Sequence, residues 1–247
     1  MKCCAVIPVF NHEHAVGAVV AALRTHGLPV LMVDDGSRPS CAAVLDTLVA
    51  DDPQGVRLVR RAENGGKGAA VADGLRAALA AGFTHALQID ADGQHDTADV
   101  PRFLAAAQAE PRHAIIGCPL YDESVPRGRL YGRYATHVWV WINTLSLRIT
   151  DSMCGFRVYP LEAVVRELDR ARIGRRMDFD VEVLVRLDWA GVPIRNLPTR
   201  VRYPEDGVSH FRPLADNLAI SWMHTRLFFG MLLRAPRLIA RHFLGAA

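Results

Sequence analysis

The chain has 247 residues, of which 50% are hydrophobic and 22% are charged, and this balance fits a folded globular protein and excludes a disordered one. The formal net charge of +3 is too small to indicate nucleic-acid binding by itself, so no nucleic-acid partner is expected.

The first half of the chain alternates short apolar runs with longer helical patterns. Strands are predicted at residues 3–9, 29–33, 55–59 and 84–89, and helices at residues 12–25, 39–49 and 66–81. Gly82 stands where a glycine that ends a helix belongs. Repeated strand–helix–strand units predict right-handed crossovers, and so an α/β fold with a mostly parallel central sheet flanked by helices.

The second half of the chain is less regular. We expect strands at residues 114–118 and 156–159, an extended segment at 192–203, and helices at 128–147, 178–190 and 213–244, the last with a break or kink at Pro236. No internal repeat or clear linker divides the chain. We therefore predict one domain over residues 1–212 and an amphipathic helical extension over residues 213–247.

Polar segments follow four of the predicted strands. They are residues 9–11, 34–37, 64–68 and 90–92. Ligands of parallel sheets gather beyond the carboxyl ends of the strands, so these segments are expected to share one edge. The agreement of four strand ends indicates a ligand site more strongly than any one motif.

The acidic loop Asp90-Ala91-Asp92 comes directly after a buried strand. Two carboxylates one residue apart point to the same side, and Mg²⁺ or Mn²⁺ accepts one or two carboxylates together with phosphate oxygens. A solvated acidic turn is the alternative, since turns favour Asp. The position of the loop at the ligand edge, with Gln94 and His95 adjacent, favours the metal site.

The other two motifs at this edge suit a nucleotide. Asp35 can accept hydrogen bonds from a base or ribose, although an Asp-Gly turn with Ser37 as a helix cap explains the same residues. Gly66 opens a helix whose free N–H groups favour an anion, and Lys67 adds a positive charge. The spacing is not that of a Walker motif.

These motifs together resemble the family 2 glycosyltransferases of the GT-A fold, particularly the dolichyl-phosphate mannose synthase-like branch. The matching segments are residues 7–11 with Glu13, 34–37, 64–68 and 90–95. The resemblance implies that Asp92 and Gln94 hold a Mg²⁺ or Mn²⁺ cofactor. It implies that the nucleotide sugar is contacted by Pro8, Phe10, Asn11, Glu13, Asp35, Gly66, Lys67, Asp90 and Ala91.

The second half matches the same family in part. Residues 151–157 resemble a segment ending in Gly-Phe-Arg that lies near the sugar and the acceptor, which makes Arg157 a further expected contact. Residues 177–182 match the place of a carboxylate base, with Asp180 as the first choice and Glu182 as the second. Stabilisation of a helix N-terminus by Asp178 and Asp180 is the alternative.

The sequence does not identify the acceptor of the sugar. Residues 207–210 resemble the family's Gly-x-Ser-Lys element but end in His210, and Pro204 stands where the polyprenyl-phosphate branch usually has an arginine. His210 is expected either to contact the donor diphosphate or to pack. Three arginines before or within the predicted helix either clamp phosphates or form a solvated basic face: Arg127, Arg129 and Arg133.

The last thirty residues interleave large apolar side chains with arginines. This composition is typical of an interfacial helix on an anionic membrane, and packing on the domain or in a homodimer contact is the alternative. No uncharged run approaches the about 20 residues that span a bilayer. The five cysteines show no zinc spacing and favour free thiols. We expect a cytoplasmic chain, free or peripheral on the inner face of the cell membrane.

The sequence thus predicts a metal-dependent, inverting glycosyltransferase of the hexosyltransferase type. It would move a sugar from a nucleoside diphosphate, UDP or GDP, to a hydroxyl or to a lipid-linked acceptor such as polyprenyl phosphate. Two alternatives are a nucleotidyltransferase that makes sugar nucleotides and a non-catalytic nucleotide-binding protein. The first would have a longer Gly-rich basic signature near its N-terminus, which the sequence lacks.

Overall fold

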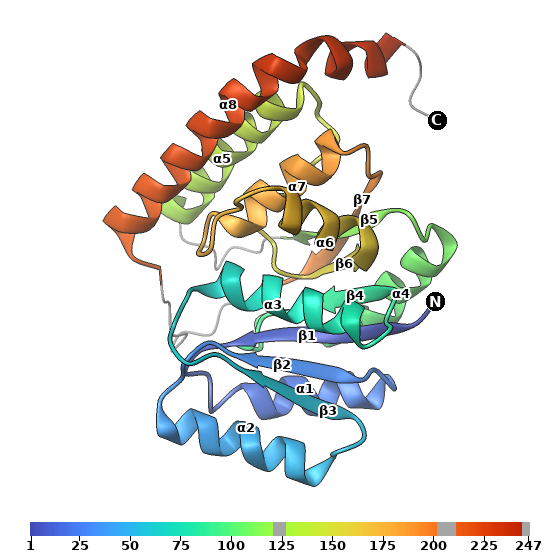
Figure 1. Ribbon diagram of the computed structural model, residues 1–247, viewed down its shortest axis with the longest axis vertical. Coiled ribbons are helices and arrows are strands. Elements are labelled where there is room, and N and C mark those ends of the chain that lie inside the picture. Colours follow the sequence, from blue (N-terminus) through green and yellow to red (C-terminus); the bar gives the residue numbers. More distant parts are fainter. Residues whose placement is uncertain (121–126, 202–210, 244–247) are drawn as a thin grey trace.

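The computed structural model describes residues 1–120, 127–201 and 211–243. Its centre is a seven-stranded sheet in the order β3-β2-β1-β4-β6-β5-β7 (Figure 1). The strands are β1 (Cys3–Val9), β2 (Val30–Asp34), β3 (Val56–Arg60), β4 (His85–Gln88), β5 (Ala114–Leu120), β6 (Arg157–Pro160) and β7 (Ile194–Arg200). Strand β6 is antiparallel to both of its neighbours, and the other pairs are parallel.

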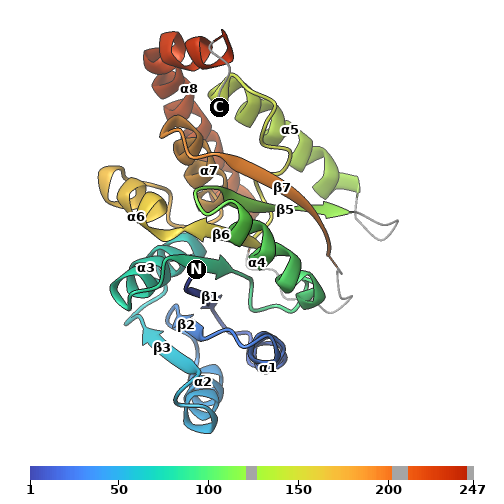
Figure 2. The same cartoon turned by 90° about the vertical axis from the view of Figure 1, so that its right-hand side faces the viewer.

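Helices cover both faces of the sheet. They are α1 (Val16–Thr25), α2 (Pro39–Asp51), α3 (Lys67–Ala80), α4 (Val100–Ala109), α5 (Arg127–Thr144), α6 (Leu161–Arg170), α7 (Phe179–Trp189) and α8 (Pro213–Phe243), with a 3₁₀ turn η1 (Thr97–Asp99) before α4. Figure 2 shows α3 and α6 on one side of the sheet and α1 and α4 on the other. Two buried apolar clusters fill the space between these layers.

The close approach of α3 to the sheet follows from its small residues. Alanines and glycines dominate the helix, and most of them are buried. A Cβ atom at Gly74 would lie 2.5 Å from Cγ1 of Val6 on β1, so a larger residue there would push the helix outward. This packing sets the first residue of α3, Lys67, at the carboxyl end of β1 and β4.

The predicted α/β architecture with a mostly parallel sheet is confirmed. The helix end at Gly82 is confirmed too: this residue has φ +80°, its N–H donates to the carbonyl of Leu79, and the N–H of Phe83 donates to the carbonyl of Ala78. The first helix starts at Val16 and not at residue 12, because residues 13–15 form a turn. Helices α4 and α6 lie in segments for which no element was predicted.

Helix α8 is one helix across Pro236, and it changes direction toward its C-terminal end (Figure 1). It packs on α5 and α7: the amide of Asn143 lies 3.2 Å from Nδ1 of His224, and Arg226 pairs with Glu182 at 3.0 Å. These contacts fix α8 on the chain that precedes it. The boundary at residue 212 stays a prediction.

Candidate active site

The Gly-rich turn before α3 is folded around the carboxylate of Asp35. This side chain is only 2% exposed, and it accepts the N–H groups of Gly65 at 2.9 Å and Gly66 at 2.8 Å. Nε of Arg61 lies 2.9 Å away on the same group. Burial raises the pKa of Asp35 despite these donors. The acidic group at this turn is therefore the Asp35 side chain of the protein itself. Its hydrogen bonds occupy the N–H groups of Gly65 and Gly66, which were expected to be free for a ligand.

The turn after β1 is tied to the start of α2. The N–H of Asn11, a residue with φ +57°, donates to Oγ of Ser37 at 3.1 Å, and Oδ1 of Asn11 accepts the N–H of Arg38 at 2.8 Å. Glu13 accepts from Oγ of Ser40 at 3.1 Å. The predicted nucleotide contacts on this segment are the buried Pro8 and the half-buried Phe10, Asn11 and Glu13. They line up at the edge of the sheet where β1 and β2 end.

Lys67 joins the acidic loop to helix α7. Its Nζ lies 2.8 Å from Oδ1 of Asp90 and 2.9 Å from Oδ2 of Asp180. Burial would lower the pKa of Lys67, but the charges of Asp180 and Asp90 outweigh it and raise the pKa above its ordinary range. Gln88, the last residue of β4, donates to Oδ1 of Asp180 at 3.0 Å. The structure thus brings together two expected contacts of the nucleotide sugar, Lys67 and Asp90, and the first choice of base, Asp180.

Asp90 is packed between three segments. Nε2 of His95 lies 3.6 Å from its Oδ2, and the His95 ring stacks on Phe156 with centroids 5.6 Å apart. On the other side Gly155 leaves no room: a Cβ there would overlap the Asp90 carboxylate. Burial would raise the pKa of Asp90, but Lys67 and His95 outweigh it and hold the pKa well below its usual range. Asp90 is therefore ionised and held in one place.

Asp92 has the electrostatics of a partial metal site. Its Oδ1 accepts the N–H of Gln94 at 3.0 Å, and its pKa is raised, first by burial and then by the charge of Asp90. A divalent cation beside the two carboxylates would relieve this repulsion, so the residues fit Mg²⁺ or Mn²⁺. Among the described residues no group of three or more His, Cys, Asp or Glu side chains could hold a metal. A cation here would need further oxygens, such as those of a diphosphate.

Arg157 lies under the site. Its side chain is 0% exposed, and its guanidinium donates to the carbonyls of Cys154 at 2.6 Å, Ser152 at 2.8 Å and Asp180 at 2.7 Å. It also donates to the hydroxyl of Tyr159. These bonds organise residues 152–157 and the start of α7. Arg157 was expected to contact the ligand directly. In this arrangement it would instead act by positioning the groups that do.

The two candidate bases differ in their surroundings. Glu182 is 0% exposed, and its carboxylate is held by Arg186 at 2.7 Å, by Arg226 at 3.0 Å and by the N–H of Gly174 at 2.9 Å. It joins α7 to α8. Asp180 is 5% exposed and lies on the side of α7 that meets Lys67. The structure places Asp180, and not Glu182, with the other candidate residues.

Arg133 points inward onto the segment before β6. Its Nε lies 2.7 Å from Oδ2 of Asp151, and Oδ1 of the same carboxylate accepts the N–H groups of Met153 and Cys154. Burial would raise the pKa of Asp151, but His137 and Arg133 lower it to about 2. Arg133 therefore has a structural ion pair and is not part of a solvated basic face. His210 and Pro204, and the side chains of Arg127 and Arg129, lie outside the described residues.

Two residues of the site were missed by sequence reasoning. Gln88 carried a signal, because it is a polar residue at the end of β4, a strand that is buried along its whole length. Arg61 carried none, since its pairing with Asp35 depends on which distant segments meet. Gly155 lies in the segment that was expected near the sugar and the acceptor, but its role of making room for Asp90 could not be foreseen.

Comparison with known families gives one match that covers most of this site. Residues 4–165 match the family described as Glycosyl transferase family 2. The chain is 28% identical over 221 residues to the polyprenol monophosphomannose synthase of Mycolicibacterium smegmatis, covering 83% of this chain and 78% of that one. It is also 28% identical over 209 residues to the undecaprenyl-phosphate mannosyltransferase of Micrococcus luteus, covering 80% of this chain and 82% of that one.

Solved structures share the fold. The glucosyl-3-phosphoglycerate synthase of Mycobacterium tuberculosis superposes with a TM-score of 0.60 at 16% identity, covering 93% of this chain and 79% of that one. A mannosyltransferase of Pyrobaculum calidifontis, solved with GDP-Man and Mn²⁺, superposes with a TM-score of 0.56 at 14% identity, covering 99% of this chain and 79% of that one. These likenesses show that the fold is that of GT-A glycosyltransferases.

Proposed function

The chain belongs to the family 2 glycosyltransferases, and from that premise we propose that it transfers a sugar from a nucleoside diphosphate to a lipid-linked phosphate, with Mg²⁺ or Mn²⁺ as cofactor. Family membership sets aside the nucleotidyltransferase and the non-catalytic alternatives. The acceptor class is supported by relatives named polyprenol monophosphomannose synthase, undecaprenyl-phosphate mannosyltransferase and dolichyl-phosphate beta-glucosyltransferase. The solved relative that holds GDP-Man and Mn²⁺ supports the donor class and the cofactor.

The observation that carries the acceptor proposal is the state of the two candidate bases. Asp180 is paired with Lys67, and Glu182 is buried between Arg186 and Arg226. Both oxygens of each carboxylate are already engaged by donors, so neither group is free to accept the hydrogen bond of an acceptor hydroxyl as a base must. A hydroxyl acceptor would need such a base, whereas a phosphate is already ionised at neutral pH and does not. The site therefore suits a phosphate acceptor better than a hydroxyl.

An exposed apolar stripe lies beside this site. Asp216, near the start of α8, pairs with Arg176 at 3.8 Å, and a Cβ at Gly66 would lie 2.7 Å from Cγ of Arg176. The start of α8 is thus anchored to the Gly-rich turn. Exposed side chains at helical spacing follow along α8: Leu214, Leu218, Trp222, Phe229 and Leu233. A second set lies on α5: Tyr134, Val138 and Ile142.

We propose that these two stripes rest in a membrane interface, where a lipid-linked acceptor would be found. Within the described ranges, no helix is long and apolar enough to cross a bilayer. The chain would then contact the membrane through one face of these helices. Packing against a second copy of the chain is the alternative way to cover the exposed apolar side chains.

In our proposal, the residues of the site have separate chemical roles. Asp92 and Gln94 would hold the cation, which when bound would supply positive charge to the departing nucleoside diphosphate. Lys67 places a positive charge beside Asp90, next to where the diphosphate would lie. An oxygen of the acceptor phosphate attacks the anomeric carbon as its bond to the diphosphate breaks on the opposite face. One displacement of this kind inverts the configuration of the sugar.

The proposal is tested by comparing two acceptors that differ only in the phosphate. The full chain would be incubated with Mn²⁺, several UDP- and GDP-sugars, and either undecaprenyl phosphate or undecaprenol. We expect an acid-labile glycosyl lipid from the phosphate alone, and loss of that product with EDTA or in Asp92→Asn at an unchanged melting temperature. Transfer to undecaprenol at a similar rate would contradict the acceptor, and full activity of Asp92→Asn would contradict the metal site.

A further inference from the structure

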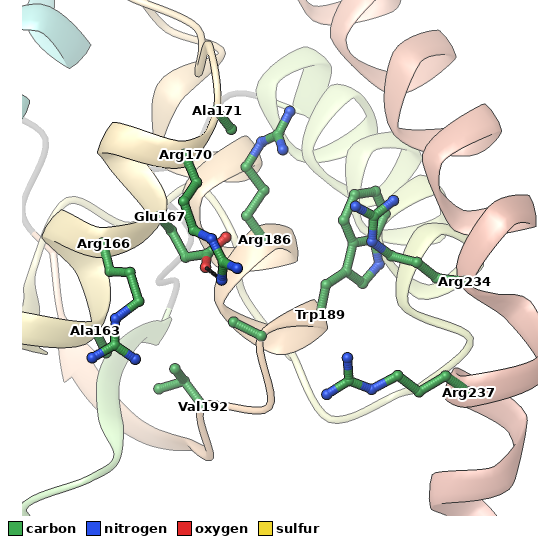
Figure 3. Close-up of a pocket in the computed structure, with 11 residues that line it drawn as sticks. Ala163, Arg166, Glu167, Arg170, Ala171, Arg186, Trp189, Val192, Arg234 and Arg237 are labelled. Atoms are coloured by element: carbon green, nitrogen blue, oxygen red, sulfur yellow. Dashed lines mark ion pairs between the residues drawn. The ribbon is translucent and has the colours of Figure 1, made fainter.

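Five arginines converge on a cavity of about 440 Å³ between α6, α7 and α8. They are Arg166 and Arg170 on α6, Arg186 on α7, and Arg234 and Arg237 on α8 (Figure 3). Among the described residues that line it, Glu167 is the one carboxylate. Pockets of about 300–1,000 Å³ are the size that small ligands occupy. The cavity lies near the end of α7, roughly 13 Å along that helix from Asp180 at about 1.5 Å per residue.

Two of these guanidinium groups are held in place by the protein. Arg186 is fixed by Glu182, with Nη2 2.7 Å from Oε1. Arg234 stacks over the ring of Trp189 at 4.6 Å and donates to the carbonyl of Gly230 at 2.9 Å. A cation that stacks on an indole keeps its N–H edges available to a ligand. One side of the cavity thus offers donors that lose little freedom when an anion binds.

The remaining charge is poorly compensated. Arg170 has a partner in Glu167 at 3.5 Å, but Arg166 and Arg237 have no ion pair or hydrogen bond with any residue that the structure describes. Figure 3 shows Arg237 reaching from α8 toward the centre of the cavity and Arg166 standing opposite on α6. Convergent like charges in a concave site produce a focused positive potential. Without a ligand, these groups repel one another.

We propose that this cavity binds an anion that carries a phosphate group, at a site separate from the proposed donor site. Guanidinium groups match phosphate oxygens with paired, charge-assisted hydrogen bonds. The volume exceeds that of phosphate alone, and Trp189 with Val192 gives the cavity an apolar wall for the organic part of a phosphate ester. The inference does not depend on the proposed transferase activity. A free phosphorylated molecule and an anionic lipid headgroup share this chemistry, and the test separates them.

The test removes the two arginines that have no partner among the described residues. Arg166→Gln/Arg237→Gln would be compared with Arg57→Gln/Arg112→Gln, a control that removes two charges that are likewise exposed but lie elsewhere. Binding of inorganic pyrophosphate would be measured by calorimetry in EDTA, so that no cation occupies the acidic loop. Binding to phosphatidylcholine vesicles containing phosphatidylglycerol would be measured by cosedimentation. Equal melting temperatures would show that both variants are folded.

We expect the cavity variant, and not the control, to lose at least tenfold in affinity. A selective loss for pyrophosphate supports a free phosphorylated ligand, and a selective loss for vesicles supports a lipid headgroup. Equal behaviour of the two double variants with both probes, or no binding of either probe by the unaltered chain, would overturn the proposal. Ala163→Glu gives a second test, because a carboxylate within reach of Arg166 should compete with the ligand at no cost in stability.

Discussion

Nζ of Lys67 lies 2.9 Å from Oδ2 of Asp180, although Lys67 begins α3 and Asp180 lies on α7. The same nitrogen lies 2.8 Å from Oδ1 of Asp90 on the acidic loop. One ammonium group therefore links the proposed donor site to the carboxylate that the sequence favoured as a base. One buried ammonium group thus pairs with two buried carboxylates, and removing it would leave both without their shared cationic partner.

Replacing Lys67 should reveal this coupling. Lys67→Met would leave Asp90 and Asp180 without their shared cation, and we expect the free energy of unfolding to fall by about 2–4 kcal/mol. Asp180→Asn removes one of the two charges, so Lys67→Met/Asp180→Asn should recover at least half of that loss. Urea unfolding of the four proteins in the cycle measures it. Additive losses would show that the two residues do not interact. Glycosyl transfer should stay low in both Lys67 variants, whatever their stability.

Gly155 should be needed for activity because of the space that it leaves. A methyl group there would overlap the Asp90 carboxylate, so Gly155→Ala must displace Asp90 or the segment that carries it. We expect kcat/KM to fall at least tenfold. Gly132→Ala is the matched control, since Gly132 lies within helix α5 and a Cβ at that position meets nothing within 4 Å. That control should keep its activity and gain about 0.5–1 kcal/mol of stability. An active Gly155→Ala would contradict the assigned role.

The parts of the site that follow strands could be predicted from the sequence, because the ends of parallel strands must share an edge. Residues 34–37, 64–68 and 90–92 were placed correctly at that edge by their spacing alone. The contacts between them could not be predicted. Nothing in the order of residues says that Asp35 uses the N–H groups of the Gly-rich turn, or that Arg157 turns under the site, since both depend on the packing of distant segments.

The secondary structure, too, could be predicted from the sequence only in part. Periodicity located most strands and helices of the first half, and it missed α6, whose charged residues mask a buried face of Leu161, Val164, Val165 and Leu168. Pro236 predicted a break or a kink in the last helix; α8 continues across this residue without a break and changes direction toward its C-terminal end (Figure 1). Contacts on both sides of Pro236 hold that helix in place: Met231 before it and Leu238 after it are buried, and Arg241 pairs with Asp188 at 2.9 Å. Tertiary packing here overrides a local preference.

Glu182 is expected to act through stability and not through chemistry. Glu182→Gln leaves Arg186 and Arg226 without their buried carboxylate, so the free energy of unfolding should fall by about 3 kcal/mol. Because this side chain is 0% exposed, kcat measured on folded protein should stay within about twofold of the unaltered chain. Denaturant unfolding and steady-state kinetics give the two numbers. A large loss of kcat with unchanged stability would make Glu182 the base and reverse the assignment.

The apolar stripe of α8 predicts binding to uncharged membranes. Leu218 and Trp222 are each 63% exposed and lie one helical turn apart. If the stripe enters the interface, Leu218→Ser/Trp222→Ser should reduce partitioning into phosphatidylcholine vesicles at least tenfold, because the loss removes buried apolar area and not charge. Leu147→Ser, which removes a leucine that is 71% exposed beyond the end of α5, should change partitioning little. Cosedimentation at high salt isolates the apolar contribution, since salt screens the neighbouring arginines. Unchanged partitioning of the double variant, with a shift from dimer to monomer in analytical ultracentrifugation, would instead assign the stripe to a contact between two copies of the chain.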